Sequence, residues 1–259
     1  MLTLRYSVQS QKGLRSNNED AAFAGPRLLA LADGMGGHAA GEVAASLAIA
    51  EIMTLNEPLP SQDILGELRD AILRVNAAIA HRTATDPEVA GMGTTLTAIL
   101  LAGEHLGLAH VGDSRAYLLR DGSLRQLTRD DTFVQSLVDE GRITPEEAWR
   151  HPRRSMVLKG LTGQEVEPYL ERLQAEPGDR YLICSDGLSD YVPADAIAEA
   201  VRILDHRRCP QELIRLALRH GSQDNITCIV ADMMEGDSGY NIAVTTGAVG
   251  SRGMLVSGK

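Results

Sequence analysis

Apolar and polar positions along this chain follow two different periods, which change from block to block. A loosely alternating segment at 2–8 and an apolar run at 28–32 predict strands in the first part of the chain. Two segments with helical spacing follow, one at 41–53 and one that has Ser61 as its expected N-cap and continues to Ile79. This mixture of strand and helix patterns is typical of layered α+β folds.

The middle of the chain has a different organisation. Three strand patterns follow one another directly, at 94–101, 105–111 and 115–119. Consecutive strands of this kind predict antiparallel pairing. Thr144, with Pro145 and Glu147 after it, predicts a helix that begins with a capping box. Strands are predicted again at 169–174, 180–184 and 226–233, and helices at 194–204 and 211–220.

The composition changes near the C-terminal end, where Gly, Ser and Thr dominate and no helical stripe is present. We therefore expect residues 1–235 to form the folded domain and residues 236–259 to be a tail or linker outside its core. We find no signal peptide and no run of about 18 apolar residues, so we expect no membrane span.

Composition and charge narrow the class of protein. Hydrophobic residues make up 44% of the 259 positions and aromatic residues only 3%, so aliphatic side chains must fill the core. The net charge of −10 and the lack of a basic, aromatic strip argue against a nucleic-acid partner. Cys184, Cys209 and Cys228 show no metal or disulfide spacing. We expect buried, reduced thiols and a cytoplasmic protein.

Four aspartates stand beside a small or polar residue at the boundary of an apolar run: Asp33, Asp113, Asp186 and Asp224. Taken alone, each is typical of a turn. Carboxylates gathered at one rim of a sheet would repel one another unless protons or divalent cations neutralised them. Mg²⁺ and Mn²⁺ prefer oxygen ligands, and the absence of a side chain at Gly34 leaves its carbonyl free to approach a metal.

The polar segment at 15–20 adds candidates for phosphate chemistry. The guanidinium of Arg15 could hold a phosphate, although it could also be a solvated loop side chain. Glu19 and Asp20 could orient metal-bound waters or simply be surface charges. The sequence contains no P-loop and no serine-hydrolase elbow, and no two of the seven histidines are three or four positions apart. Ligation by aspartates therefore indicates Mg²⁺ or Mn²⁺ acting on phosphate esters.

Six segments, taken together and in this order, resemble the motifs of the metal-dependent protein phosphatases (PPM, the type 2C serine/threonine phosphatases), most closely the bacterial members. They are 15–20 (RSNNED), 32–38 (ADGMGGH), 91–96 (GMGTTL), 110–115 (HVGDSR), 184–188 (CSDGL) and 224–227 (DNIT). The resemblance covers roughly residues 5–233. It implies a four-layer αββα sandwich, in which two central antiparallel β-sheets are flanked by helices. It also implies hydrolysis of phosphoserine and phosphothreonine by in-line attack of a hydroxide that bridges two metal ions.

The same resemblance implies metal ligands. Asp33 would bridge two Mn²⁺ or Mg²⁺ ions, with the carbonyl of Gly34 on one of them. Asp186 and Asp224 would complete the other. Asp113, together with Asp186, would hold the third ion that is often present in bacterial members.

Further roles implied by the resemblance concern the substrate. Arg15 would bind the phosphate, and Glu19 and Asp20 would act through waters. Residues from about 140 to 163 would form a variable flap beside the site. The partners would be phosphorylated proteins, namely Ser/Thr kinases and their substrates, and we expect a monomer.

Two positions depart from the family pattern. Met35 stands where some members carry a histidine proposed as the general acid, and we do not assume that His38 replaces it. The leaving alkoxide would then be protonated by a metal-bound water. Asp131 stands where relatives often have a histidine, and we assign it no role.

Two other functions fit part of the pattern. A pseudophosphatase would bind phosphoproteins as a scaffold without turning them over, but the candidate ligands and Arg15 are all present. A metal-dependent nuclease or phosphodiesterase would use similar carboxylates, but the acidic net charge disfavours it. We favour the phosphatase.

Overall fold

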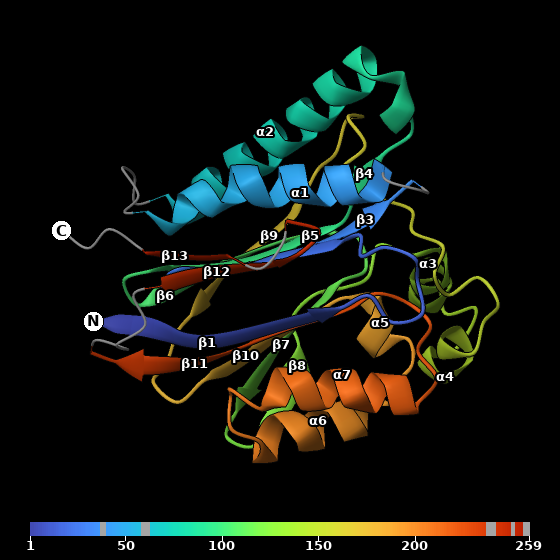
Figure 1. Cartoon of the computed structure of the whole chain (residues 1–259). Helices are drawn as coiled ribbons and strands as arrows, with labels where there is room; N and C mark the ends of the chain where they lie inside the picture. Colours follow the sequence, from blue (N-terminus) through green and yellow to red (C-terminus); the bar gives the residue numbers. More distant parts are fainter. Residues whose placement is uncertain (37–39, 58–62, 237–241, 250–251, 256–259) are drawn as a thin grey trace.

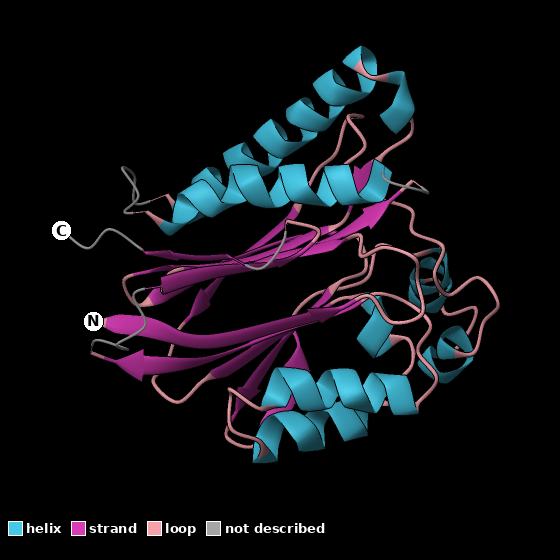
Figure 2. Cartoon of the chain, viewed as in Figure 1, coloured by secondary structure: helices cyan, strands magenta, loops and turns pink. Residues whose placement is uncertain are grey.

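The computed structural model of the chain describes residues 1–36, 40–57, 63–236, 242–249 and 252–255. Its strands form two antiparallel sheets that lie face to face, and helices cover the outer face of each sheet (Figures 1 and 2). The structure therefore confirms the αββα sandwich.

The first sheet contains five strands in the order β1-β11-β10-β7-β8. They are β1 (Leu2–Gln11), β11 (Ile226–Glu235), β10 (Arg180–Cys184), β7 (Arg115–Arg120) and β8 (Ser123–Gln126). The second sheet has the order β13-β12-β2-β3-β5-β6-β9, and a short strand, β4, pairs with β3. They are β13 (Arg252–Leu255), β12 (Ile242–Gly247), β2 (Asp20–Ala24), β3 (Leu28–Met35), β5 (Leu96–Ala102), β6 (His105–Val111), β9 (Tyr169–Gln174) and β4 (Gly93–Thr94).

The helices fall into three groups (Figure 1). Helices α1 (Ala40–Ile52) and α2 (Ile64–Thr85) cover the second sheet. Helices α6 (Ala194–Ile203) and α7 (Cys209–Arg219) cover the first sheet. Three short helices lie near one end of the sandwich: α3 (Phe133–Asp139), α4 (Pro145–Trp149) and α5 (Asp186–Ser189). Two 3₁₀ turns, Met53–Asn56 and Pro87–Val89, follow α1 and α2.

Burial on both faces explains why the central strands are apolar without interruption. In β3, Leu28 and Ala30 pack into the core beneath α1 and α2. Leu29 and Leu31 point the other way, into the core between the two sheets. Successive side chains of a strand alternate between faces, so a strand covered on both sides needs an apolar residue at every position.

The predicted helix starts can be compared with the caps in the structure. The capping box of Thr144 and Glu147 is present and confirms that prediction. Ser61 lies outside the described residues. Helix α2 has Asp63 as its N-cap, and Oδ1 of Asp63 accepts the N–H of Gly66 at 3.0 Å. None of the helices described is both long enough and apolar enough to cross a lipid bilayer.

The C-terminal segment differs from the expectation of a tail outside the core. Strand β12 pairs antiparallel with β2, and Ala243 is buried. The Gly, Ser and Thr content of 236–259 suggested a linker, but the β-branched run from Val244 to Thr246 has high strand propensity and has the open edge of β2 to pair with. Residues 237–241, 250–251 and 256–259 lie outside the described residues.

Candidate metal centre

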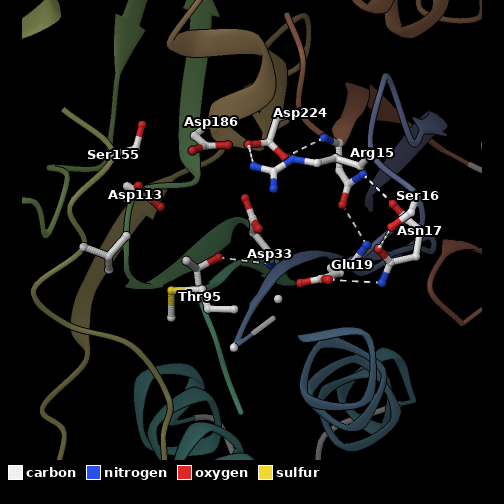
Figure 3. A pocket seen from close by; sticks show the side chains of 15 residues that line it. Arg15, Ser16, Asn17, Glu19, Asp33, Thr95, Asp113, Ser155, Asp186 and Asp224 are labelled. Carbon is white, nitrogen blue, oxygen red and sulfur yellow. Dashed lines mark hydrogen bonds and ion pairs between the residues drawn. The ribbon is translucent and has the colours of Figure 1, made fainter. Parts of the chain in front are cut away.

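One cavity of about 470 Å³ collects the four strand-end aspartates (Figure 3). Asp33 lies near the end of β3, and Asp113 lies in the turn between β6 and β7. Asp186 opens α5 directly after β10, and Asp224 lies just before β11. The ends of strands from both sheets thus bring together carboxylates that are up to 191 residues apart in the sequence (33 to 224).

Burial and the charges of neighbouring carboxylates disfavour the ionised forms of Asp33, Asp113 and Asp186. Burial, followed by the charges of Asp20 and Asp186, raises the pKa of Asp33 well above its usual value. Burial, followed by the charge of Asp113, does the same to the pKa of Asp186. Burial raises the pKa of Asp113 to about 7 and that of Asp20 to about 6. A cavity in which several carboxylates resist ionisation is suited to cations, which would stabilise the ionised forms.

We expect the metal-free protein to lose stability as the pH rises from about 4 to about 7, the interval bounded by the ordinary and the raised pKa values of Asp20 and Asp113. In that interval these carboxyls keep protons in the folded state that they lose in the unfolded state, so the free energy of unfolding falls with increasing pH. Thermal unfolding in EDTA at several pH values measures this slope.

The Asp113→Asn variant tests whether Asp113 contributes to this pH dependence. In EDTA its free energy of unfolding should fall less steeply with pH than that of the wild type, because the variant lacks the carboxyl at position 113. Saturating Mn²⁺ should reverse the slope in the wild-type protein, since metal ligands must be deprotonated. Equal slopes for the wild type and the variant in EDTA would contradict the prediction.

Asp20 supplies a buried carboxylate oxygen beside the cavity. Its side chain is fully buried, and Oδ2 accepts the hydroxyl hydrogen of Ser185 at 2.8 Å. Within the described part of the chain, Oδ1 has no hydrogen-bond partner. Asp20 is also the register partner of Asp33 across β2 and β3. A buried oxygen without a partner, next to repelling carboxylates, fits a site that holds hydrated cations.

The backbone around Asp33 is fixed from three sides. Its N–H donates to Oγ1 of Thr95 at 3.1 Å, and its carbonyl accepts Oγ1 of Thr94 and the N–H of Thr95, both at 2.9 Å. The next residue, Gly34, lies so close to the carbonyls of Glu19 and Gly41 that an added Cβ would collide with both. Glycine is therefore required here for close packing, and the Asp33 carboxylate is held facing the cavity (Figure 3).

Asn225 ties the loop of Arg15 and Glu19 to the rest of the site. Its Nδ2 donates to the carbonyls of Lys12 at 3.0 Å and Asn17 at 2.9 Å. Its Oδ1 accepts the N–H of Glu19 at 2.8 Å. In the sequence Asn225 is only one letter of the segment 224–227, and nothing local could have indicated that its amide holds a loop about 210 residues away.

Arg15 reaches into the cavity and forms an ion pair with Asp224 at 2.7 Å (Figure 3). This hydrogen bond raises the pKa of Arg15 above its usual value. The guanidinium remains half-exposed, with 59% of its side-chain surface accessible. The positive charge of Arg15 therefore offsets part of the negative charge in the cavity.

The carboxylates line the cavity without closing on one point. Among the described residues, no three acidic, histidine or cysteine side chains form a ready-made ligand group. Mg²⁺ and related ions usually keep several waters and take only a few protein oxygens. The four aspartates therefore fit ions that keep part of their water shell better than ions that are coordinated only by protein atoms.

Comparison with known proteins identifies the family. Residues 11–220 match the family model described as protein phosphatase 2C. This chain belongs to the protein phosphatase 2C family. Curated proteins similar to this chain include bacterial serine/threonine phosphatases, so the resemblance in the motifs is confirmed.

Two curated relatives show how much of each known protein this chain covers. The chain is 57% identical over 249 residues to the serine/threonine protein phosphatase PstP of Mycobacterium tuberculosis, and the match covers 96% of this chain and 48% of that protein. It is 37% identical over 240 residues to the serine/threonine phosphatase stp of Listeria monocytogenes, covering 88% of this chain and 91% of that protein. The chain thus spans about half the length of PstP.

Solved structures agree with this assignment. The crystal structure of the M. tuberculosis phosphatase PstP/Ppp has a TM-score of 0.88 and 58% identity, and covers 90% of this chain and 100% of its own. The PstP catalytic domain in complex with two manganese ions has a TM-score of 0.86 and 56% identity, and covers 91% of this chain and 100% of its own.

The expected flap at about 140–163 is joined to the neighbourhood of the cavity by two side chains, Asp131 and Asp190, that had no role assigned from the sequence. Asp131 accepts the N–H of Gly112 at 3.1 Å and pairs with Lys159 of the flap at 3.2 Å. Asp190 accepts the hydroxyl of Ser155, a flap residue that lines the cavity, at 3.0 Å. Asp190 stands four positions after Asp186. In a helical turn this spacing places both side chains on one side, and it could have indicated that Asp190 lies near the cavity.

Met35 stands where some family members carry a histidine that is proposed as the general acid. Met35 lines the cavity, and its thioether has no proton to donate. His38 lies outside the described residues.

Proposed function

We propose that this chain hydrolyses phosphoserine and phosphothreonine in proteins with the help of two divalent cations. The observation that carries the proposal is the single cavity in which four mutually repelling carboxylates face the guanidinium of Arg15. The family match and the serine/threonine phosphatase names of the relatives support the same reaction.

The residues proposed to hold the ions are those that line the cavity. Asp33 would serve both ions, with the carbonyl of Gly34 on one and Asp186 and Asp224 on the other. Asp113 and Asp186 could take a third ion. When bound, such ions lower the pKa of water to supply a nucleophile and neutralise charge on the phosphoryl group. The two manganese ions of the PstP catalytic domain support Mn²⁺ as the metal to test first.

Arg15 is proposed as the residue that binds the phosphate. A guanidinium forms two parallel hydrogen bonds to phosphate oxygens, and Arg15 is exposed at the cavity. Its ion pair with Asp224 would be exchanged for the phosphate once a cation takes over that carboxylate. Glu19, whose carboxylate accepts Nδ2 of Asn17 at 3.1 Å, and Asp20 would orient waters.

The described residues that line the cavity include no histidine and no cysteine. This composition supports direct attack by water rather than a phosphohistidine or phosphocysteine intermediate. Met35 supplies no proton to the leaving alkoxide, so a water would have to supply it.

The proposed reaction also suggests the partners, the oligomeric state and the location of the protein. Phosphorylated proteins, including Ser/Thr kinases and their targets, are the expected partners, and we expect a monomer. The three cysteines are buried free thiols, which fits the reducing cytoplasm. A scaffold that only binds phosphoproteins would not need the carboxylates around Arg15, and the net charge of −10 disfavours a nuclease.

The test is phosphate release from phosphothreonine, phosphoserine and phosphotyrosine peptides, with and without Mn²⁺ and EDTA. We expect Mn²⁺-dependent release from the first two peptides and its loss in EDTA. The Asp186→Asn variant should be inactive, whereas Asp70→Asn, at an exposed position of α2, should match the wild type. Absence of release at saturating Mn²⁺ would favour the scaffold, and Mn²⁺-dependent nicking of a plasmid would favour the nuclease.

A further inference from the structure

Strand β12 lies between β13, the edge strand, and β2 in the second sheet (Figure 1), and the residue after it contacts Asp20. It pairs antiparallel with β2, from Val244 opposite Ala24 to Gly247 opposite Ala21. The first residue of β2 is Asp20, the buried acid whose Oδ1 has no partner within the described residues. The strand therefore runs along β2 toward that acid.

Strand β12 is packed into the domain and not merely laid against it. Ala243 is 3% exposed and belongs to the core beneath α1 and α2. Val244, on the opposite face, packs against the core between the sheets. Near its start, the hydroxyl of Tyr6, itself buried, donates to the carbonyl of Ile242 at 2.6 Å. The strand thus contributes to both cores that flank the second sheet.

The end of the strand contacts Asp20 directly. The N–H of Ala248 donates to the carbonyl of Asp20 at 2.6 Å. Gly247 has a φ of +84°, and a Cβ there would collide with the same carbonyl oxygen. Only glycine allows both the left-handed conformation without strain and this close approach. The contact therefore depends on a glycine in the segment that composition alone indicated to be a linker.

Asp20 joins this contact to the metal centre. Its backbone is held by Ala248, whereas its carboxylate accepts the hydroxyl of Ser185 at 2.8 Å. It lies opposite Asp33 in the register of β2 and β3. Any shift of the Asp20 backbone would therefore move a buried carboxylate relative to the cavity.

We propose that residues 242–248 are a positioning element of the metal centre, which acts by holding Asp20 through the Gly247–Ala248 contact. The inference rests on the cation-binding part of the proposed function and not on the phosphatase reaction. Partners behind the direct ligands orient them, and their loss typically weakens metal binding by about 10- to 100-fold. The segment is therefore part of the catalytic unit and not an appended tail.

The chain offers a matched pair of variants. Gly247→Ala and Gly236→Ala both place alanine at a positive φ, +84° and +87° respectively, so both carry similar backbone strain. Only the alanine at 247 collides with Asp20, because nothing lies within 4 Å of an added Cβ at 236. Ala248→Pro removes the N–H donor without adding an atom at 247, and serves as the second variant if Gly247→Ala fails to fold.

The first measurement is Mn²⁺ affinity of the full chain by titration calorimetry. We expect Gly247→Ala and Ala248→Pro to bind Mn²⁺ about 10- to 100-fold more weakly and Gly236→Ala to bind like the wild type. Equal affinities for the 247 and 236 variants would overturn the proposal. A wild-type protein that binds Mn²⁺ but releases no phosphate would sink the phosphatase assignment and still leave this test intact.

The second measurement is amide hydrogen exchange in the metal-free protein. In Gly247→Ala, exchange should be faster over Asp20–Ala24 and unchanged in β10 and β11, which pair in the other sheet. Faster exchange in β2 without any loss of Mn²⁺ affinity would mean that β12 only pairs with β2 and does not position the metal centre, and would also overturn the proposal.

Discussion

Asp33→Asn should lower turnover of a phosphothreonine peptide by about a thousandfold or more and, in the absence of metal, make the protein more stable. The two effects have one cause. Asp33 lies in the cavity near Asp20 and Asp186, and removal from water, followed by the charges of these two neighbours, raises its pKa well above the usual value. The neutral amide removes that repulsion from the metal-free cavity, but it also removes the charge proposed to serve both cations.

The measurement combines phosphate release at saturating Mn²⁺ with thermal unfolding in EDTA. Activity should fall, and the unfolding temperature at neutral pH should rise by several degrees. Asp70→Asn, on the exposed face of α2, should change neither quantity. Near-normal hydrolysis by Asp33→Asn would refute the metal assignment, and a fall in both quantities would mean that Asp33 is needed for folding instead.

Much of the fold could be predicted because the relevant signals are local. The run 28–32 is apolar at each position since β3 is covered on both faces, and such a run is visible in the sequence. Asp33 and Asp186 were identifiable because each directly follows a buried run, and the ends of neighbouring strands meet at an edge of the sandwich. For these residues, position in the sequence almost determines position in the site.

The remaining contacts depend on residues far apart in the chain and had no local signal. Asn225 uses both atoms of its amide to hold the loop at 12–19, and Asp131 joins the turn at Gly112 to Lys159. An Asn or Asp in a loop is compatible with many such arrangements. Only the folded chain selects one.

The C-terminal strand was missed for a different reason. A strand joins a sheet only where the sheet offers it an unpaired edge, and the sequence at 242–247 does not reveal that β2 provides one. Composition dominated by Gly, Ser and Thr then favoured a linker. Ala243 packs into the core beneath α1 and α2, and Val244 packs against the core between the sheets. This alternation between the two faces of the strand can be recognised only in the folded chain.

Arg15→Ala should lower kcat/KM for a phosphopeptide by about a hundredfold or more while leaving the affinity for Mn²⁺ unchanged or improved. In the structure Arg15 holds the Asp224 carboxylate at 2.7 Å, so removing the guanidinium frees a proposed metal ligand. A merely structural arginine would not give this combination of weaker catalysis and undiminished metal binding. Little stability should be lost, because the pair is partly exposed, at 59% for Arg15 and 28% for Asp224.

Arg15→Lys separates charge from geometry. Lysine keeps the positive charge but cannot form two parallel hydrogen bonds to a phosphate, so it should recover only part of the lost kcat/KM. Arg74→Ala, at an exposed position of α2, is the matched control and should behave like the wild type. Near-normal kcat/KM in Arg15→Ala would mean that Arg15 is not the phosphate ligand. Loss of Mn²⁺ binding together with activity would mean that the site instead requires the pairing of Arg15 with Asp224.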